Sequence, residues 1–305
     1  PASVALVIFL PWAIRDSLAF GSPFPGQALS NALSLDGRDI FAWQDQPTIG
    51  RYLDAGIGTL LALRWTGLVH NVVNVLLLLG FPVALFGMVA LPAAIRTATP
   101  LRPLATFAVI TFAATTLLFP VSTTWGTFLH SAGAIHVLLM VAALVGADLL
   151  IAALGRRRGW TRPVAWLGPV LTVSAAALMT VVLVPQQAAA SRATAAQYAA
   201  LPAALAAAGA PLEADGAPVI SDHPIWLSES TGTRALALPH ESPASVLDLA
   251  QTFGARLLVV NREGTESWLD NLNAGAAGSE CFRPLVLDQS LEALRDTVVY
   301  RIDCP

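Results

Sequence analysis

The sequence predicts a multi-pass α-helical membrane protein followed by a small exported α/β domain. Two observations predict the membrane part: the mean hydropathy is +0.64, and only 12% of the 305 residues are charged. A soluble domain usually carries about 25% charged residues. The third observation is that long apolar runs give way near residue 186 to short alternating strand-like and helix-like segments, which are typical of an α/β domain.

Five apolar runs are expected to cross the membrane as helices, because a spanning helix needs about 20 apolar residues. They occupy residues 1–14, 72–94, 104–121, 134–154 and 164–184. The first run ends at Pro11-Trp12, opens without Met and lacks the charged region and cleavage site of a signal peptide. We therefore expect the chain to be a fragment; the alternative is a short native N-terminus. Pro82 lies inside the second run, where we expect it to kink the helix.

An arginine-rich loop at residues 155–163 predicts the orientation of the chain. It contains Arg156, Arg157, Arg158 and Arg162. Short loops rich in Lys and Arg stay in the cytoplasm, so this loop is predicted inside. By alternation the loop 95–103, with two arginines, is also inside, and the loop 122–133, with none, is outside. Residues 15–71 and everything after about 186 are then predicted to lie on the exported side.

The first exterior loop, residues 15–71, contains a predicted helix. Apolar residues recur at helical spacing from Ile49 to Leu61, and the aromatic side chains of Tyr52 and Trp65 suit the headgroup layer. We predict a helix over 48–65. It either lies in the outer interface or packs into the protein as a re-entrant cover, and the pattern fits both arrangements.

Polar residues at the outer edge of the membrane are the candidate substrate-binding residues: Arg15, Asp16, His70 and His130. A charged pair at a span end is commonly an anchor or a local salt bridge. The alternative is that the Arg15 guanidinium holds an anionic headgroup or a lipid phosphate, which its planar fork suits. His130 and His136 are six residues apart, about 240° around a helix, so we expect no two-histidine metal site. One histidine facing a polar cavity remains open.

Residues 186–216 form a predicted helical connector, because they are alanine-rich; we expect an interruption at Pro202. Residues 217–305 are predicted to form the α/β domain with a parallel core. The expected strands are 217–220, 235–238, 256–260, 282–287 and 297–302, the expected helices are 243–253 and 264–273, and 222–230 is a short helix or loop. Ser242 is the expected N-cap of the helix 243–253, and Gly254 its stop.

The only two cysteines, Cys281 and Cys304, lie in this domain. They face each other if the last two strands pair antiparallel, and an exported domain permits a disulfide; the alternative is two free thiols. The sequence contains no CxxC motif and no phosphate-binding loop. Neither a zinc site nor a nucleotide cofactor is therefore predicted. Asp222 and His223 follow a strand, at the edge where α/β sites form, although a strand-end turn is the commoner explanation.

The run Pro11-Trp12-Ala13-Ile14-Arg15-Asp16, followed by Phe20-Gly21-Ser22-Pro23-Phe24-Pro25-Gly26, resembles the later part of GT-C fold membrane glycosyltransferases. The nearest group is that of the bacterial protein O-mannosyltransferases and aminoarabinose transferases. The segments 231–234 (TGTR) and 253–260 (FGARLLVV) are similar to the tail of that group.

The resemblance implies transfer of a sugar, with inversion, from a polyprenyl-phosphate donor on the exported face. It implies that Arg15 contacts the donor phosphate and that the general base, an Asp of the family's first exterior loop, lies upstream of Pro1. Asp16 departs from the Asn often found there. The expected partners are membrane lipid, the lipid-linked sugar donor and an acceptor, with no nucleic acid.

Two other functions compete with this one. A transporter or lipid flippase would show internal repeats and charges at mid-membrane, whereas the only charge within a predicted span is Asp148, near an inner end. A membrane-anchored binding or assembly protein would use the exported domain as its working part.

Overall fold

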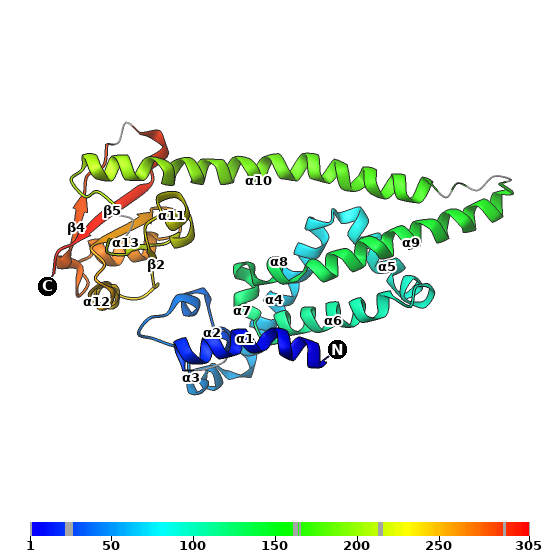
Figure 1. Cartoon of the computed structure of the whole chain (residues 1–305), viewed down its shortest axis with the longest axis horizontal. Helices are drawn as coiled ribbons and strands as arrows, with labels where there is room; N and C mark the ends of the chain where they lie inside the picture. Colours follow the sequence, from blue (N-terminus) through cyan, green and yellow to red (C-terminus); the bar gives the residue numbers. More distant parts are fainter. Residues whose placement is uncertain are drawn as a thin grey trace. The chain divides into compact units, whose positions relative to one another are not determined.

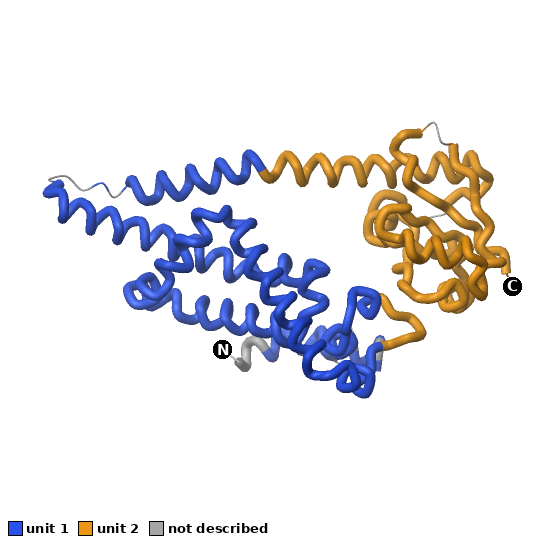
Figure 2. Tube along the Cα trace, turned by 180° about the vertical axis from the view of Figure 1, so that it is seen from behind, with its two compact units in different colours: residues 1–40, 47–182 blue, residues 41–46, 183–305 orange. Residues whose placement is uncertain are grey.

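The computed structural model describes residues 2–21, 27–160, 164, 166–212, 216–288 and 291–304. The chain divides into two compact units, which are described separately (Figures 1 and 2). Unit 1 comprises Pro1–Ile40 and Pro47–Val182, and unit 2 comprises Phe41–Gln46 and Leu183–Pro305.

Helices make up the regular structure of the described part of unit 1. In chain order they are α1 (Ala2–Phe20), α2 (Gln27–Leu33), the 3₁₀ turn η1 (Gly37–Phe41), α3 (Ile49–Asp54), α4 (Gly56–Leu78), α5 (Phe81–Thr97), α6 (Leu101–Leu117), α7 (Pro120–Ser122), the π-helical turn η2 (Thr123–Thr127), α8 (Phe128–Ser131), α9 (Gly133–Arg158) and the first part of α10 (Leu167–Ala207). Among the described residues, α4, α9 and α10 are long and apolar enough to cross a membrane, and α6 with its bent continuation makes a fourth candidate.

The second predicted run, residues 72–94, is interrupted. α4 ends at Leu78 and α5 begins at Phe81. Between them Gly80 has a φ of +76°, a backbone conformation that favours glycine. Pro82 lies in the first turn of α5, where its missing N–H leaves no helical hydrogen bond unmade. The expectation of a continuous helix kinked at Pro82 is therefore wrong, because the chain breaks before Pro82 and that residue starts the next helix.

The helix predicted over 48–65 is also divided differently. Thr48 caps the short helix α3, and the chain turns at Ala55 before α4 begins at Gly56. α4 then continues without interruption into the first part of the predicted second run. The helical spacing was therefore correct, but the boundary placed at about residue 71 was not.

Two further boundaries differ from the prediction. α1 does not end at Pro11-Trp12: Pro11 lies inside it, and the helix continues to Phe20. The loop predicted at 122–133 is mostly helical, because α7, η2 and α8 occupy it. This helical segment, Pro120–Ser131, is bent by 101° from α6. Gly126, with a φ of +101°, lies in this bent segment.

The arginines of the predicted inner loop extend α9 instead. Arg156, Arg157 and Arg158 form the last turn of α9, and Gly159 closes the helix in the left-handed conformation. Cations at this position are favoured by the negative end of the helix dipole. Arg162 and the predicted turn at 22–26 lie outside the described residues.

α5 and α9 lie side by side and run in the same direction (Figure 1). A Cβ atom added at Gly87 would lie 2.4 Å from the Leu139 carbonyl oxygen, and one added at Gly146 would lie 2.3 Å from the Ala90 Cβ. Small residues permit such close approach of helices in an apolar environment. The core around this pair also includes the fully buried Phe128.

Unit 2 contains a five-stranded sheet in the order β2-β1-β3-β5-β4. The strands are β1 (Val219–Ser221), β2 (Ala235–Ala237), β3 (Leu257–Asn261), β4 (Phe282–Leu285) and β5 (Thr297–Ile302). β1 pairs in parallel with β2 and with β3, whereas β5 pairs antiparallel with β3 and with β4. The predicted parallel core and the antiparallel last pair are both present.

Helices cover both faces of the sheet. α12 (Pro243–Phe253) and α13 (Glu266–Asn273) pack on the face that carries Ile220, Leu258 and Tyr300. The end of α10 and α11 (Pro224–Thr231) pack on the other face, which carries Val219 and Val259. Successive strand residues point to opposite faces, which is why neighbours in sequence enter different cores.

The end signals predicted for α12 are confirmed. It has the predicted bounds, with the Ser242 side chain accepting from the Ser245 N–H and Gly254 in the left-handed conformation. The connector is different: Pro185 and Pro202 both lie inside α10, which runs unbroken from Leu167 to Ala207. The predicted interruption at Pro202 is therefore absent.

Candidate functional site

The break after α6 places polar side chains inside the apolar part of unit 1. The fully buried Asn71 of α4 donates from its amide nitrogen to the Thr116 hydroxyl at 3.0 Å. Its amide oxygen accepts from the Thr123 hydroxyl at 2.7 Å. Side-chain hydrogen bonds of this kind join helices that have only apolar surroundings. We call this region, Asn71 with Thr116, Ser122 and Thr123, the broken-helix site.

Several buried polar atoms of unit 1 have no hydrogen-bond partner. Among the residues that the structure describes, they are Asn31 Oδ1, His70 Nε2, Ser122 Oγ and His136 Nε2. His70 precedes Asn71, Ser122 belongs to the broken-helix site, and α2, which carries Asn31, packs against α7. An unpaired buried polar group costs roughly 1–3 kcal/mol, so each needs an explanation such as a bound ligand or water.

The segment between α1 and α4 contacts η2 through Trp125. The indole ring of Trp125 lies so close to Gly37 that a Cβ added there would be 2.4 Å from the Trp125 Nε1. Asp39, only 4% exposed, accepts from Arg51 at 2.6 Å. Its second oxygen accepts from the Leu35 N–H at 2.7 Å. These bonds hold the 35–39 turn in one conformation beside η2.

Two more arginines, Arg38 and Arg64, form hydrogen bonds in and beside this segment. Arg38 donates to the Asp36 carboxylate at 2.6 Å, and this bond holds the pKa of Asp36 below its ordinary value against the opposing effect of burial. Arg64 donates to the Leu60 carbonyl at 2.7 Å and to the Tyr52 hydroxyl. These charged side chains are therefore bonded to other groups of unit 1.

Arg15 and Asp16, the first two predicted site residues, form a local pair on α1. Arg15 Nη1 lies 3.3 Å from Asp16 Oδ1, and its guanidinium lies 5.0 Å from the centre of the Trp12 ring. The local salt bridge proposed as one alternative is thus present. The Arg15 side chain remains 62% exposed, so it still offers donors to an anion.

The two histidines have different surroundings. His70 adjoins the broken-helix site on α4, whereas His130 is exposed on α8. In the part of the chain that is described, no hydrogen bond or ion pair links either histidine to Arg15 or Asp16. The predicted site residues are therefore not brought together by direct contacts.

The sequence does not predict Thr116, Ser122 and Thr123 as site residues. Thr116, Ser122 and Thr123 were treated as parts of a span and a loop. A usable signal was present, because the asparagine and these hydroxyl residues interrupt apolar runs. What the sequence does not reveal is that Asn71 and Thr123, 52 residues apart, meet.

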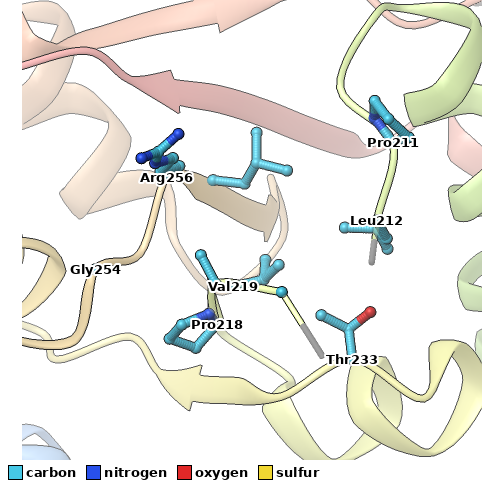
Figure 3. Close-up of a pocket in the computed structure, with 10 residues that line it drawn as sticks. Pro211, Leu212, Pro218, Val219, Thr233, Gly254 and Arg256 are labelled. Carbon is cyan, nitrogen blue, oxygen red and sulfur yellow. The ribbon is translucent and has the colours of Figure 1, made fainter. Parts of the chain in front are cut away.

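Unit 2 has a separate cavity of about 390 Å³ at the N-terminal ends of β1 and β3 (Figure 3). Pro211, Pro218 and Val219 form apolar wall, and Thr233 and Arg256 supply polar groups. The Thr233 side chain is 1% exposed, and its hydroxyl has no partner among the described residues. This cavity lies at the opposite end of the strands from Asp222.

Asp222 and His223 form a closed strand-end turn. One Asp222 oxygen accepts from the Asn261 N–H at 2.9 Å and the other from the Ser221 hydroxyl at 3.2 Å. The Asp222 side chain is 9% exposed, and His223 Nε2 lies 3.9 Å from it. These bonds account for the carboxylate, so the turn interpretation fits better than a ligand site.

Cys281 and Cys304 are joined by a disulfide, with their Cα atoms 5.1 Å apart. The antiparallel pairing of β4 with β5 sets Phe282 opposite Ile302, which brings the two cysteines together. The bridge therefore closes the end of the sheet as the sequence predicted.

Comparison with known proteins identifies no relative: no protein-family model, no curated protein and no solved structure matches the chain.

Proposed function

We propose that the chain is the C-terminal part of a membrane glycosyltransferase that moves a sugar from a polyprenyl-phosphate donor to an acceptor on the exported face. The observation that carries the proposal is the broken-helix site, where Asn71 and Ser122, with the adjoining His70, place polar atoms inside an apolar bundle. A lipid-linked sugar needs both surroundings at once, because its tail is apolar and its head group is polar. The type of reaction is suggested by the resemblance of Pro11–Asp16 to the GT-C group.

The chemistry divides between this chain and residues upstream of Pro1. In an inverting transfer a carboxylate base takes the proton of the acceptor hydroxyl, whose oxygen attacks the anomeric carbon. The bond from that carbon to the phosphate oxygen breaks, and polyprenyl phosphate leaves. We assign the base to the upstream part. Arg15 would stabilise the negative charge on the leaving phosphate, and its exposed guanidinium fork suits that task.

The proposal includes a membrane orientation. The arginines that end α9 face the cytoplasm, and the C-terminal α/β domain lies on the exported side. The apolar helices α4, α9 and α10 support the membrane location. The unpaired hydroxyl of Ser122 and the unpaired Nε2 of His70 are then available to sugar hydroxyls near the outer end of the bundle.

The test uses the full-length protein, including the sequence upstream of Pro1. Transfer from a labelled polyprenyl-phosphate sugar should fall roughly 100-fold or more in Arg15→Ala, because a group that stabilises charge in the transition state is lost. Arg192→Ala, an exposed cation on α10, is the matched control and should leave transfer unchanged.

Two results would count against the proposal in different ways. Unchanged transfer in Arg15→Ala would refute the role of Arg15 in the donor site, whereas the proposed sugar transfer itself would be retained. The wild-type protein can also be reconstituted in vesicles. If it moves a lipid-linked sugar between the leaflets of the bilayer without transferring the sugar to an acceptor, it is a flippase and not a transferase.

A further inference from the structure

Residues 41–46 belong to unit 2, although the residues on both sides of them belong to unit 1 (Figure 2). We call this segment the strap. The Glu241 carboxylate accepts three successive backbone N–H groups of the strap: those of Trp43 at 2.6 Å, Gln44 at 3.0 Å and Asp45 at 3.2 Å. Successive backbone donors form a nest for an anion, and each bond to the carboxylate is charge-assisted.

Trp43 anchors the strap on α12. Its indole N–H donates to Asp248 at 2.6 Å, and its ring meets the Phe253 ring edge-on with centroids 5.7 Å apart. The ring also packs against the buried core that contains Val246. The Ser245 hydroxyl adds a 2.9 Å bond to the Gln44 side chain. A packed aromatic ring with its polar atom bonded is typical of a specific docking contact.

We propose that the strap fastens the segment between α1 and α4 to the C-terminal domain, so that both lie on one side of the membrane and α4 with α5 makes a single broken crossing. This inference rests on the membrane location in the proposed function but not on sugar transfer. A chain that leaves one side and returns to it must cross an even number of times. Of the helices between the strap and the C-terminal sheet, five have 17 residues or more: α4, α5, α6, α9 and α10. Because five is odd, these helices cannot all be separate crossings. If α4 and α5 together make one crossing, the number of crossings is four.

The junction of α4 and α5 has the properties of a break inside a crossing. Leu79 and Gly80 are buried, and a Cβ added at Gly80 would lie 2.5 Å from Met179 Cγ of α10. The residues around them, 77–82, are apolar throughout. A turn between two crossings would instead meet headgroups and water. α5 also has only 17 residues, fewer than the roughly 20 that a crossing needs.

The position of Asn71 along the bundle agrees with a single crossing made of α4 and α5. Asn71 bonds Thr116 at the end of α6, so α4 is already at that end of the bundle when only its last two turns remain. α5 then runs in the same direction as α9, from Gly87 beside Leu139 to Ala90 beside Gly146. The chain from Asn71 to Thr97 therefore crosses the bundle once, in one direction, and the break lies within that crossing.

Single-cysteine labelling tests the crossing. Both cysteines of residues 1–305 are in the disulfide, so an introduced cysteine is the only free thiol of this part of the protein. We choose exposed positions: Gln46→Cys in the strap, Glu229→Cys in α11, Thr99→Cys between α5 and α6, and Leu78→Cys at the break. In sealed vesicles an impermeant maleimide should label 46 and 229 from the same face, 99 from the other face, and 78 from neither. Labelling of 46 and 229 from opposite faces, or of 78 as fast as 46, would overturn the single crossing.

Hydrogen exchange tests the strap itself. The amides of Trp43, Gln44 and Asp45 should be protected in the whole protein. Glu241→Gln should speed their exchange by roughly tenfold or more, because the charge-assisted bonds weaken. Trp43→Phe, which keeps a ring and removes the indole N–H, should also speed it. Glu229→Gln on the opposite face of the sheet is the matched control. Unprotected amides in the wild type, or no change in both variants, would overturn the docking whatever the outcome for transfer.

Discussion

The side chains of Asn71 and Thr123 meet inside the apolar bundle of unit 1, where the Thr123 hydroxyl donates a 2.7 Å hydrogen bond to the Asn71 amide oxygen. Both residues are fully buried. Asn71 also bonds Thr116, so a single side chain ties the end of α6 to the bent segment after it. The geometry of the broken-helix site therefore depends on one asparagine.

The first prediction concerns that asparagine. Thr123→Val keeps the volume but leaves the Asn71 oxygen without its partner, and it should lower the free energy of unfolding by about 1–3 kcal/mol. Asn71→Leu combined with Thr116→Val and Thr123→Val should cost less than the single changes added together, because no polar atom is then left unpaired. Thermal unfolding in detergent measures both, and an unchanged midpoint for Thr123→Val would contradict the prediction.

The second prediction concerns the Asp39–Arg51 ion pair. Arg51→Leu leaves the buried Asp39 carboxylate without its cation. We expect a loss of about 2–3 kcal/mol, less than for a fully buried pair because the Arg51 side chain is 33% exposed. Arg38→Leu removes the neighbouring exposed pair with Asp36 and should cost at most about 1 kcal/mol. Equal losses in chemical denaturation of the two variants would refute the distinction.

The third prediction concerns the disulfide. Cys281 and Cys304 are 23 residues apart in sequence, and closing a loop of that size stabilises a domain by about 3 kcal/mol in the chain-entropy model. Cys281→Ser with Cys304→Ser should lower the unfolding midpoint of the C-terminal domain. Adding a reductant should produce the same shift in the wild type and none in the double variant. A reductant-sensitive double variant would show that the shift has another cause.

The fourth prediction concerns the contact of α5 with α9. Gly87→Ala would place a Cβ 2.4 Å from the Leu139 carbonyl oxygen, so the two backbones must separate. We expect a loss of about 1–3 kcal/mol, as for other overpacked sites. Gly58→Ala on α4, which has no atom within 4 Å, should stabilise the protein by about 0.5–1 kcal/mol through helix propensity. Comparing the two unfolding midpoints separates packing from propensity.

Local signals in the sequence determined much of the C-terminal domain. Ser242 and Gly254 set the ends of α12, because a cap and a left-handed glycine act within one helical turn. The run Thr297–Ile302 is rich in β-branched and aromatic residues, which favour a strand, and the antiparallel pairing of that strand brings Cys281 and Cys304 together. Each of these features depends on residues close in sequence or on the regular period of a strand.

Only the tertiary structure decided where the apolar helices break and which distant segments meet. The run around Gly80 is apolar on both sides, so its composition is the same for one continuous helix as for two. The break depends on packing, with Gly80 against Met179 and Gly87 against Leu139. The bond from Trp43 to Asp248 joins residues 205 positions apart and leaves no pattern in the sequence near either one. Hydropathy reports how apolar a segment is, whereas its path depends on contacts between side chains that are remote in the chain.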